Sequence, residues 1–194
     1  MPYEVRHHTE RLRNKVFAIV TDEVVMPDGS TAERDYMVHV GAVGVVALDH
    51  EGRVALVHQY RPAVGKHLWE LPAGLIDVEG EALVDAAARE LAEEADIMAA
   101  RWDLLAEVLT SPGCSNEKIR LFLARELSPV PAEQRHTRTQ EEAELEVTWV
   151  PLDEAVTMAL SGEITNAACL VGVLGAAQAR DRDWKTLQPP AAAT

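Results

Sequence analysis

Three glutamates within one predicted helix are the residues whose types and spacing point to chemistry. Residues 82–95 are rich in alanine, leucine and glutamate and contain neither glycine nor proline, which predicts a helix. Glu90 and Glu94 fall at the border of its apolar face, and Glu93 falls just beyond them. Like charges four residues apart repel, and partial burial adds to the cost. A divalent cation would offset it, because Mg2+ prefers oxygen ligands and is commonly held by carboxylates. The alternative is an acidic face in solvent.

The apolar face of this helix is expected to consist of small and aliphatic side chains. They are Val84, Ala87, Ala88, Leu91 and Ala95.

The helix and the loop before it closely resemble the Nudix box. That motif is a glycine, five residues, a glutamate, seven residues, and then Arg-Glu-apolar-any-Glu-Glu-any-Gly-apolar. This sequence has Gly74, Glu81 and the run Arg89-Glu90-Leu91-Ala92-Glu93-Glu94-Ala95-Asp96-Ile97. All the fixed charged positions of the motif match.

Two positions depart from the box. Six residues separate Gly74 from Glu81, so a one-residue bulge is expected at 78–80. Asp96 stands where the motif has its closing glycine, at a position that looks like a helix C-terminal cap. A left-handed conformation there favours glycine but tolerates aspartate, so we expect some loss of stability and no loss of chemistry.

The resemblance implies an α/β fold, an α/β/α sandwich around a mixed sheet, and hydrolysis of a diphosphate with Mg2+ or Mn2+. It also implies the metal ligands, which are Glu90, Glu93, Glu94 and the carbonyl oxygen of Ala73. Glu93 would bind directly or through water, Arg89 would orient the cluster, and Glu81 would pair with Arg89. Such metals polarise the diphosphate and lower the pKa of the attacking water.

Segments outside the box resemble the ADP-ribose pyrophosphatase branch of the family. They are Gln59-Tyr60-Arg61, Trp69-Glu70-Leu71-Pro72-Ala73-Gly74 and Ser111-Pro112-Gly113. A proline in the mid-teens after the box marks this branch, and Pro112 lies 15 residues after Ile97. The implied reaction is hydrolysis of ADP-ribose to AMP and ribose 5-phosphate. The alternatives are hydrolysis of other nucleoside diphosphate sugars and a non-catalytic sensor that binds ADP-ribose.

By the same resemblance, substrate-binding residues are spread along the chain. They are Phe17, Arg34, Arg61, Glu70, Pro112, Gly113 and Glu117. Arg61 would contact the diphosphate, since a guanidinium matches phosphate oxygens. Glu117 would hold the terminal ribose, Phe17 would stack on adenine, and Arg34 would reach the ligand. A core phenylalanine and an exposed strand arginine are the commoner explanations of the last two.

A polar loop holds the remaining catalytic candidate. Glu142 is preferred over its neighbour Glu141 as general base or ligand of a third metal. The alternative is an acidic loop in solvent. The histidines show no metal-ligand spacing, and none is assigned a catalytic role.

The elements that must position these residues follow from β-branched runs and turn residues. We expect an N-terminal β-hairpin extension at 1–40, a Nudix hydrolase domain at 41–182, and a disordered tail at 183–194. In this branch the hairpin exchanges across a dimer, so a homodimer is expected. Strands are predicted at 16–26, 31–39, 41–48, 54–60, 104–110, 119–124 and 145–150. The strands at 41–48 and 54–60 are expected to pair, and a loop is predicted at 61–79. Further helices are predicted at 152–160 and 166–180.

Composition narrows the functional class. The net charge of -14 disfavours a nucleic-acid partner, and no apolar run is long enough for a membrane span. The N-terminal residues do not resemble a secretory signal, so a cytoplasmic location is expected. The two cysteines lack the spacing of a zinc site. A small anionic substrate remains, and it would need arginines and divalent cations to offset the negative field.

Overall fold

The computed structural model describes residues 3–138 and 145–193 of the 194-residue chain. The chain divides into two compact units, Met1–Gly41 with Leu109–Lys118, and Ala42–Val108 with Ile119–Thr194. The boundary between the units after Gly41 lies close to the domain boundary expected at 40. The first unit also contains the turn-rich segment Leu109–Lys118, which was not expected to belong to it.

The first unit contains a three-stranded antiparallel sheet in the order β1-β2-β3. Its strands are β1 (Val5–Arg13), β2 (Phe17–Val25) and β3 (Thr31–His39). The predicted hairpin is confirmed as β2 and β3. Strand β1 was not predicted, because it consists mainly of charged and histidine residues and is almost wholly exposed. It is held by backbone pairing with β2, and by a contact from His8 Nδ1 to the buried Asp22 carboxylate.

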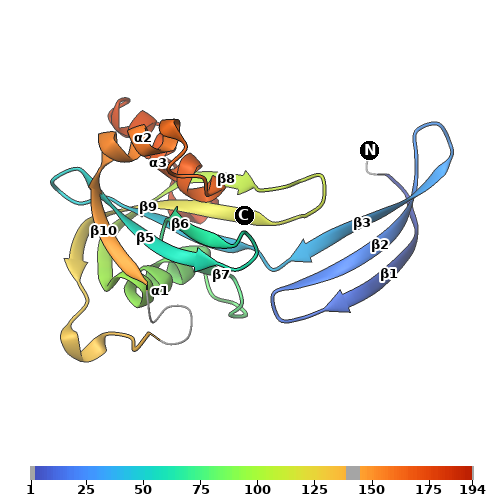
Figure 1. Ribbon diagram of the computed structural model, residues 1–194, viewed down its shortest axis with the longest axis horizontal. Helices are drawn as coiled ribbons and strands as arrows, with labels where there is room; N and C mark the ends of the chain where they lie inside the picture. The colour runs from blue at the N-terminus through green and yellow to red at the C-terminus, as the bar shows by residue number, and fades with distance from the viewer. Residues whose placement is uncertain (1–2, 139–144, 194) are drawn as a thin grey trace. The chain divides into compact units, whose positions relative to one another are not determined.

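The described part of the second unit contains two sheets and three α-helices (Figure 1). One sheet has the order β7-β4-β9-β8, with β4 (Ala42–Ala47), β7 (Ala73–Leu75), β8 (Ile97–Leu109) and β9 (Lys118–Pro129). It is mixed, since β4 runs parallel to β9 and antiparallel to β7. The other is antiparallel, in the order β10-β5-β6, with β5 (Arg53–Arg61), β6 (Lys66–Glu70) and β10 (Glu146–Pro151).

Helices cover both faces of these sheets, as the predicted sandwich requires. The helices are α1 (Leu83–Ala95), α2 (Leu152–Ser161) and α3 (Ala167–Arg180); the short 3-10 helices are η1 (Ala132–Gln134) and η3 (Pro190–Ala192). Side chains alternate along β4, so Val43 and Val45 enter a core with α1, whereas Val46 enters a second core with α2 and α3. Figure 1 shows α1 on one side of the strands and α2 and α3 on the other.

The predicted strands β4 and β5 are present but lie in different sheets. Among the described residues, they are joined by the turn at 49–52, where the Asp49 N–H donates to the Arg53 carbonyl, and by an isolated bridge between Leu48 and Val54. The predicted loop at 61–79 contains the short strands β6 and β7, one pairing with β5 and the other with β4. These strands are short and lie among Pro62, Gly65 and Pro72. They have too few residues to show the alternation of polar and apolar side chains that predicts a strand.

The C-terminal residues 183–193 are placed on the second unit, which differs from the disorder expected from their composition. Trp184 covers the Arg125 guanidinium, whose Cζ is 4.5 Å from the ring centroid. Leu104 and Gln188 exchange backbone hydrogen bonds of 2.8 and 3.2 Å. An aromatic contact and one backbone pair therefore hold a segment that ends in Pro-Pro-Ala-Ala-Ala.

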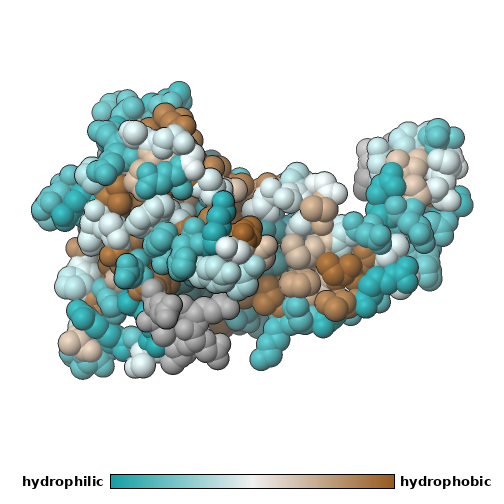
Figure 2. Space-filling model, viewed as in Figure 1, coloured by the Kyte–Doolittle hydropathy of each residue, from teal (hydrophilic) through white to brown (hydrophobic). Residues whose placement is uncertain are grey.

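The visible face of the second unit is mainly hydrophilic, with hydrophobic residues in small groups (Figure 2). No helix in the described part of the chain is both long enough and apolar enough to cross a membrane.

Two glycines of α3 give a test of how tightly this helix packs. A Cβ on Gly172 would be 2.6 Å from Leu71 Cδ1 and 3.0 Å from Val46 Cγ2, and both neighbours are fully buried. A Cβ on Gly175 would meet Leu105 at an ordinary 3.6 Å. Gly172→Ala should lower the free energy of unfolding by about 1–3 kcal/mol through overpacking. Gly175→Ala should raise it by up to about 1 kcal/mol through helix propensity. Urea unfolding measures both, and equal effects would contradict the packing described for Gly172.

Candidate active site

Two carboxylates of α1 lie against the backbone of β7. Glu94 is 6% exposed, and its Oε2 accepts a hydrogen bond from the backbone N–H of Ala73 at 2.8 Å. The Glu90 carboxylate fills the space beside Gly74, where an added Cβ would be only 1.9 Å from Glu90 Cδ. Glycine is needed here because the carboxylate approaches the backbone so closely. Glu90 and Glu94 therefore converge on two adjacent residues of β7, Gly74 and Ala73.

Arg89 links the other acidic residues of the motif. Its Nε and Nη2 each donate to one oxygen of Glu81, both at 3.1 Å, in a two-point pair. Its Nη1 lies 2.6 Å from Glu90 Oε1 and 3.5 Å from Glu93 Oε2. Hydrogen bonding to Glu81 raises the pKa of Arg89 above its ordinary value, so the guanidinium stays charged. The expected pairing of Glu81 with Arg89 is present.

The buried face of α1 lies closer to the glutamates than the sequence pattern predicted. Its buried residues are Ala86, Ala87, Leu91, Glu94 and Ala95. Val84 and Ala88, which were expected to be buried, are only partly so. Glu94 can be buried because the Ala73 N–H compensates its charge, which periodicity alone could not reveal.

The helix ends as its sequence predicts. Asp96 adopts the left-handed conformation, with φ 55° and ψ 34°, and its N–H donates to the Ala92 carbonyl. This confirms the C-terminal cap expected where the motif has glycine.

The donor atoms at β7 and α1 suit a hard divalent cation. Glu90, Glu93 and Glu94 offer carboxylate oxygens. A further oxygen is the carbonyl of Ala73, the residue whose N–H binds Glu94. Within residues 3–138 and 145–193, no three His, Cys, Asp or Glu side chains stand close enough to hold a metal as they lie. Mg2+ sites are commonly completed by substrate phosphates and water, so the donor types fit such an ion.

Arg61 and Glu70, two predicted substrate-binding residues, are bound to each other. Arg61 Nε and Nη2 donate to the two oxygens of Glu70 at 3.0 and 2.7 Å. Gln59 Nε2 lies 3.3 Å from the same carboxylate. Glu70 is almost fully buried, whereas the Arg61 side chain is 41% exposed. The Glu70 carboxylate thus holds an arginine that has a solvent-facing side.

Glu70 also affects the buried cysteine of the second unit. Burial raises the pKa of the Cys169 thiol to about 12, and the negative charge of Glu70 contributes to the rise.

The other predicted substrate-binding residues lie in the first unit. Phe17 begins β2, pairs in register with His39, and lines a cavity of about 240 Å³. Arg34 is an exposed residue of β3 whose Nη1 donates to the Glu33 carbonyl. Pro112 and Gly113 are exposed in the turn after β8.

Glu117 is held within the first unit by two side chains. Thr110 Oγ1 donates to Glu117 Oε2 at 2.6 Å, and His39 Nε2 lies 3.9 Å from Glu117 Oε1. The Glu117 backbone N–H donates to Ser115 Oγ. His39, which was assigned no role from the sequence, is therefore a neighbour of this predicted ribose-binding residue. The loop candidates Glu141 and Glu142 lie outside the described residues.

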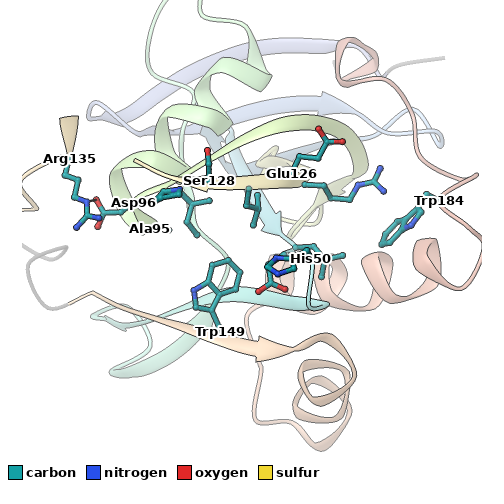
Figure 3. Close-up of a pocket in the computed structure, with 14 residues that line it drawn as sticks. His50, Ala95, Asp96, Glu126, Ser128, Arg135, Trp149 and Trp184 are labelled. Atoms are coloured by element: carbon teal, nitrogen blue, oxygen red, sulfur yellow. Dashed lines mark ion pairs between the residues drawn. The ribbon is translucent and has the colours of Figure 1, made fainter. Parts of the chain in front are cut away.

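Two cavities in the second unit differ in their chemistry. One of about 510 Å³ is lined by Arg89, Ala92 and Glu93 of α1 and by residues 134–137. Another of about 700 Å³ lies beyond the end of α1, between Trp149 and Trp184 (Figure 3). Its lining is largely apolar and includes none of the box glutamates. Of the two, the smaller cavity is therefore the one lined by motif residues, namely Arg89 and Glu93.

Sequence reasoning did not identify the residues that face the end of α1 from the loop after β9. Arg138 donates to Asp96 Oδ2 at 2.8 Å and to the Glu93 carbonyl at 3.1 Å. The signal available was weak, namely two arginines three residues apart, Arg135 and Arg138, in an acidic chain.

The approach of Glu90 to Gly74 generates a prediction about this site. In Gly74→Ala the new Cβ should displace the flexible carboxylate and leave the fold intact. We expect turnover of a diphosphate substrate to fall roughly 10- to 100-fold, the usual effect of misorienting a metal ligand. Steady-state kinetics and thermal unfolding would measure it, with Gly175→Ala as the control that keeps full activity. Full activity in Gly74→Ala would show that the position of Glu90 is unimportant.

Comparisons with known proteins find relatives over most of the chain. The NUDIX domain model matches residues 38–169. An ADP-ribose pyrophosphatase from Mycobacterium tuberculosis is 41% identical over 184 residues, covering 91% of this chain and 87% of that protein. One from Bacillus subtilis is 35% identical, covering 79% and 80%. A crystal structure of an ADP compounds hydrolase superposes with a TM-score of 0.79 and 18% identity, covering 94% of this chain and 96% of the other, which supports the fold.

The residues of the Nudix box therefore lie close together in the expected fold. The matches with known proteins extend well beyond the box, toward both ends of the chain. The chain belongs to the Nudix family of hydrolases.

Proposed function

We propose that this protein hydrolyses ADP-ribose at its diphosphate to AMP and ribose 5-phosphate, with Mg2+ as the metal and Mn2+ as a possible substitute. The observation that carries the reaction is the convergence of Glu90 and Glu94 on Ala73 and Gly74, beside the charged Arg89. The substrate is supported by the two relatives that are named ADP-ribose pyrophosphatases.

In this proposal the metal ligands are Glu90, Glu93, Glu94 and the Ala73 carbonyl. A metal held by these residues would polarise the phosphate oxygens and lower the pKa of the attacking water. The water oxygen bonds to one phosphorus as that phosphorus loses its bond to the bridging oxygen, which leaves with the other product. Arg89 limits the repulsion between the carboxylates, and Glu142 accepts the proton from the attacking water.

The substrate contacts follow the same proposal. Arg61 offers the diphosphate its exposed side while Glu70 holds the other edge of the guanidinium, which keeps the fork oriented without ligand. The other residues proposed to bind substrate keep the roles expected from the sequence. Phe17 would stack on adenine, Arg34 would reach the ligand and Glu117 would hold the terminal ribose. Pro112 and Gly113 complete the set.

Two alternatives remain in view. Other nucleoside diphosphate sugars share the diphosphate, so the box alone does not distinguish them from ADP-ribose. A non-catalytic sensor would bind ADP-ribose without turnover, but all the box carboxylates are retained here.

One experiment separates these functions. The protein should be incubated with Mg2+ and ADP-ribose, ADP-glucose, GDP-mannose or a UDP-sugar, and kcat/KM should be highest for ADP-ribose. EDTA should abolish turnover.

Variants of the metal ligands test the catalytic role. Glu90→Gln and Glu94→Gln should lose on the order of a thousandfold in kcat while remaining folded. Glu154→Gln, an exposed acid on α2, is the matched control with full activity. Faster turnover of another sugar would overturn the substrate, and the absence of turnover would favour the sensor.

We further propose that the protein acts in the cytoplasm as a homodimer formed through the first unit. Support comes from β1, an edge strand on which Val5 and Leu12 are about half exposed. Light scattering after size exclusion should give twice the 21.2 kDa chain mass. Deleting residues 1–13 should give a monomer, and a monomeric full-length protein would contradict the proposal.

A further inference from the structure

A carboxylate occupies the left-handed position at which the Nudix box has glycine. Asp96 adopts φ 55°, a conformation that disfavours side chains. A non-glycine residue in such a conformation suggests a role for its side chain, since surrounding contacts must hold it there.

Arg138 is its main partner and reaches two points at the end of α1. Its Nη2 donates to Asp96 Oδ2 at 2.8 Å, and its Nε donates to the Glu93 carbonyl at 3.1 Å. Carbonyls in the last turn of a helix lack partners within the helix, so the second bond completes the helix end. The Arg138 and Asp96 side chains are 23% and 28% exposed, which shields the pair from solvent more than a surface ion pair.

The loop between β9 and Arg138 is also fastened at its other end. The backbone N–H of Val130 donates to the Asp96 carbonyl at 2.9 Å. Arg135 Nε lies 4.0 Å from Asp96 Oδ1, and Figure 3 shows these two side chains meeting at one end of the larger cavity. Backbone and side chain of one aspartate thus hold residues 130–138 at three places.

The fastened loop forms one wall of the cleft beside the box glutamates. Residues 134–137 face Arg89, Ala92 and Glu93 across the cavity of about 510 Å³. Arg135 and His136 bring basic groups to this wall, opposite a strongly acidic helix. An anionic substrate approaching Glu93 would meet them.

From these contacts we infer that Asp96 is a positioning residue. Through Arg138 it fixes the basic wall of residues 134–137 at the distance from Glu93 that an anionic substrate requires. This inference rests on the proposed function for its substrate, and it uses only described residues. Glu141 and Glu142 are no part of it.

The test is Asp96→Gly, which restores the residue of the box and suits the left-handed conformation. If Asp96 were only a helix cap, the change to glycine would raise the stability of the protein. If Asp96 is a positioning residue, the change should lower its activity. We expect an unchanged or higher Tm, faster amide hydrogen exchange in residues 130–138, and a KM for ADP-ribose raised roughly 10-fold or more. Arg138→Gln should match these changes in exchange and KM, and the double variant should be no worse than either single one.

Two further variants make the result specific. Asp96→Asn keeps a carbonyl oxygen for Arg138 and should restore most of the KM. Asp103→Asn weakens another partly buried ion pair in the same unit, with Arg125 at 2.7 Å, and should leave KM unchanged. Unchanged exchange and KM in Asp96→Gly would overturn the inference, as would additive effects of Asp96→Gly and Arg138→Gln. If the wild type does not turn over ADP-ribose, the proposed function fails, but hydrogen exchange still tests the fastening of the loop.

Discussion

The approach of two carboxylates to the backbone of a three-residue strand is the constraint on which the site depends. Glu94 can be buried because the Ala73 N–H donates a hydrogen bond to its carboxylate, and Glu90 reaches the same segment because Gly74 has no side chain. Neither contact would form if α1 were rotated by one residue or β7 were displaced. The packing of α1 on β4 and β7, through Ala87 and Leu91, therefore determines the chemistry as much as the glutamates do.

Charge compensation explains the remaining polar contacts. In a chain of net charge -14, several buried or half-buried acids have a cation or a backbone donor beside them. Arg89 serves Glu81, Glu90 and Glu93, while Arg61 serves Glu70. These arginines hold acids in place and also carry positive charge that can face an anion. One guanidinium can perform both tasks because it presents several donors in a rigid plane.

The sequence predicted the parts of the structure that follow from local periodicity and from a dense motif. Helix α1 and its left-handed cap at Asp96 were found close to their observed bounds, and so were α2 and α3. Strands β6 and β7 were missed because they are short and are defined by their partners in β5 and β4. Strand β1 was missed because backbone pairing overrode its polar composition. The contact of Arg138 with Asp96 joins residues 42 positions apart, and no local pattern encodes such a contact.

The pairing of β7 with β4 also has a consequence for how the protein folds. Strand β4 is positioned by its parallel neighbour β9, with Ala42 opposite Ile119, so the support for β7 depends on contacts across more than seventy residues. Long-range parallel pairing is slow, whereas an alanine-rich helix forms quickly. The residues of the motif are therefore synthesised before the sheet that positions them can be completed. We expect the site to form only after β9 has been synthesised and has paired with β4.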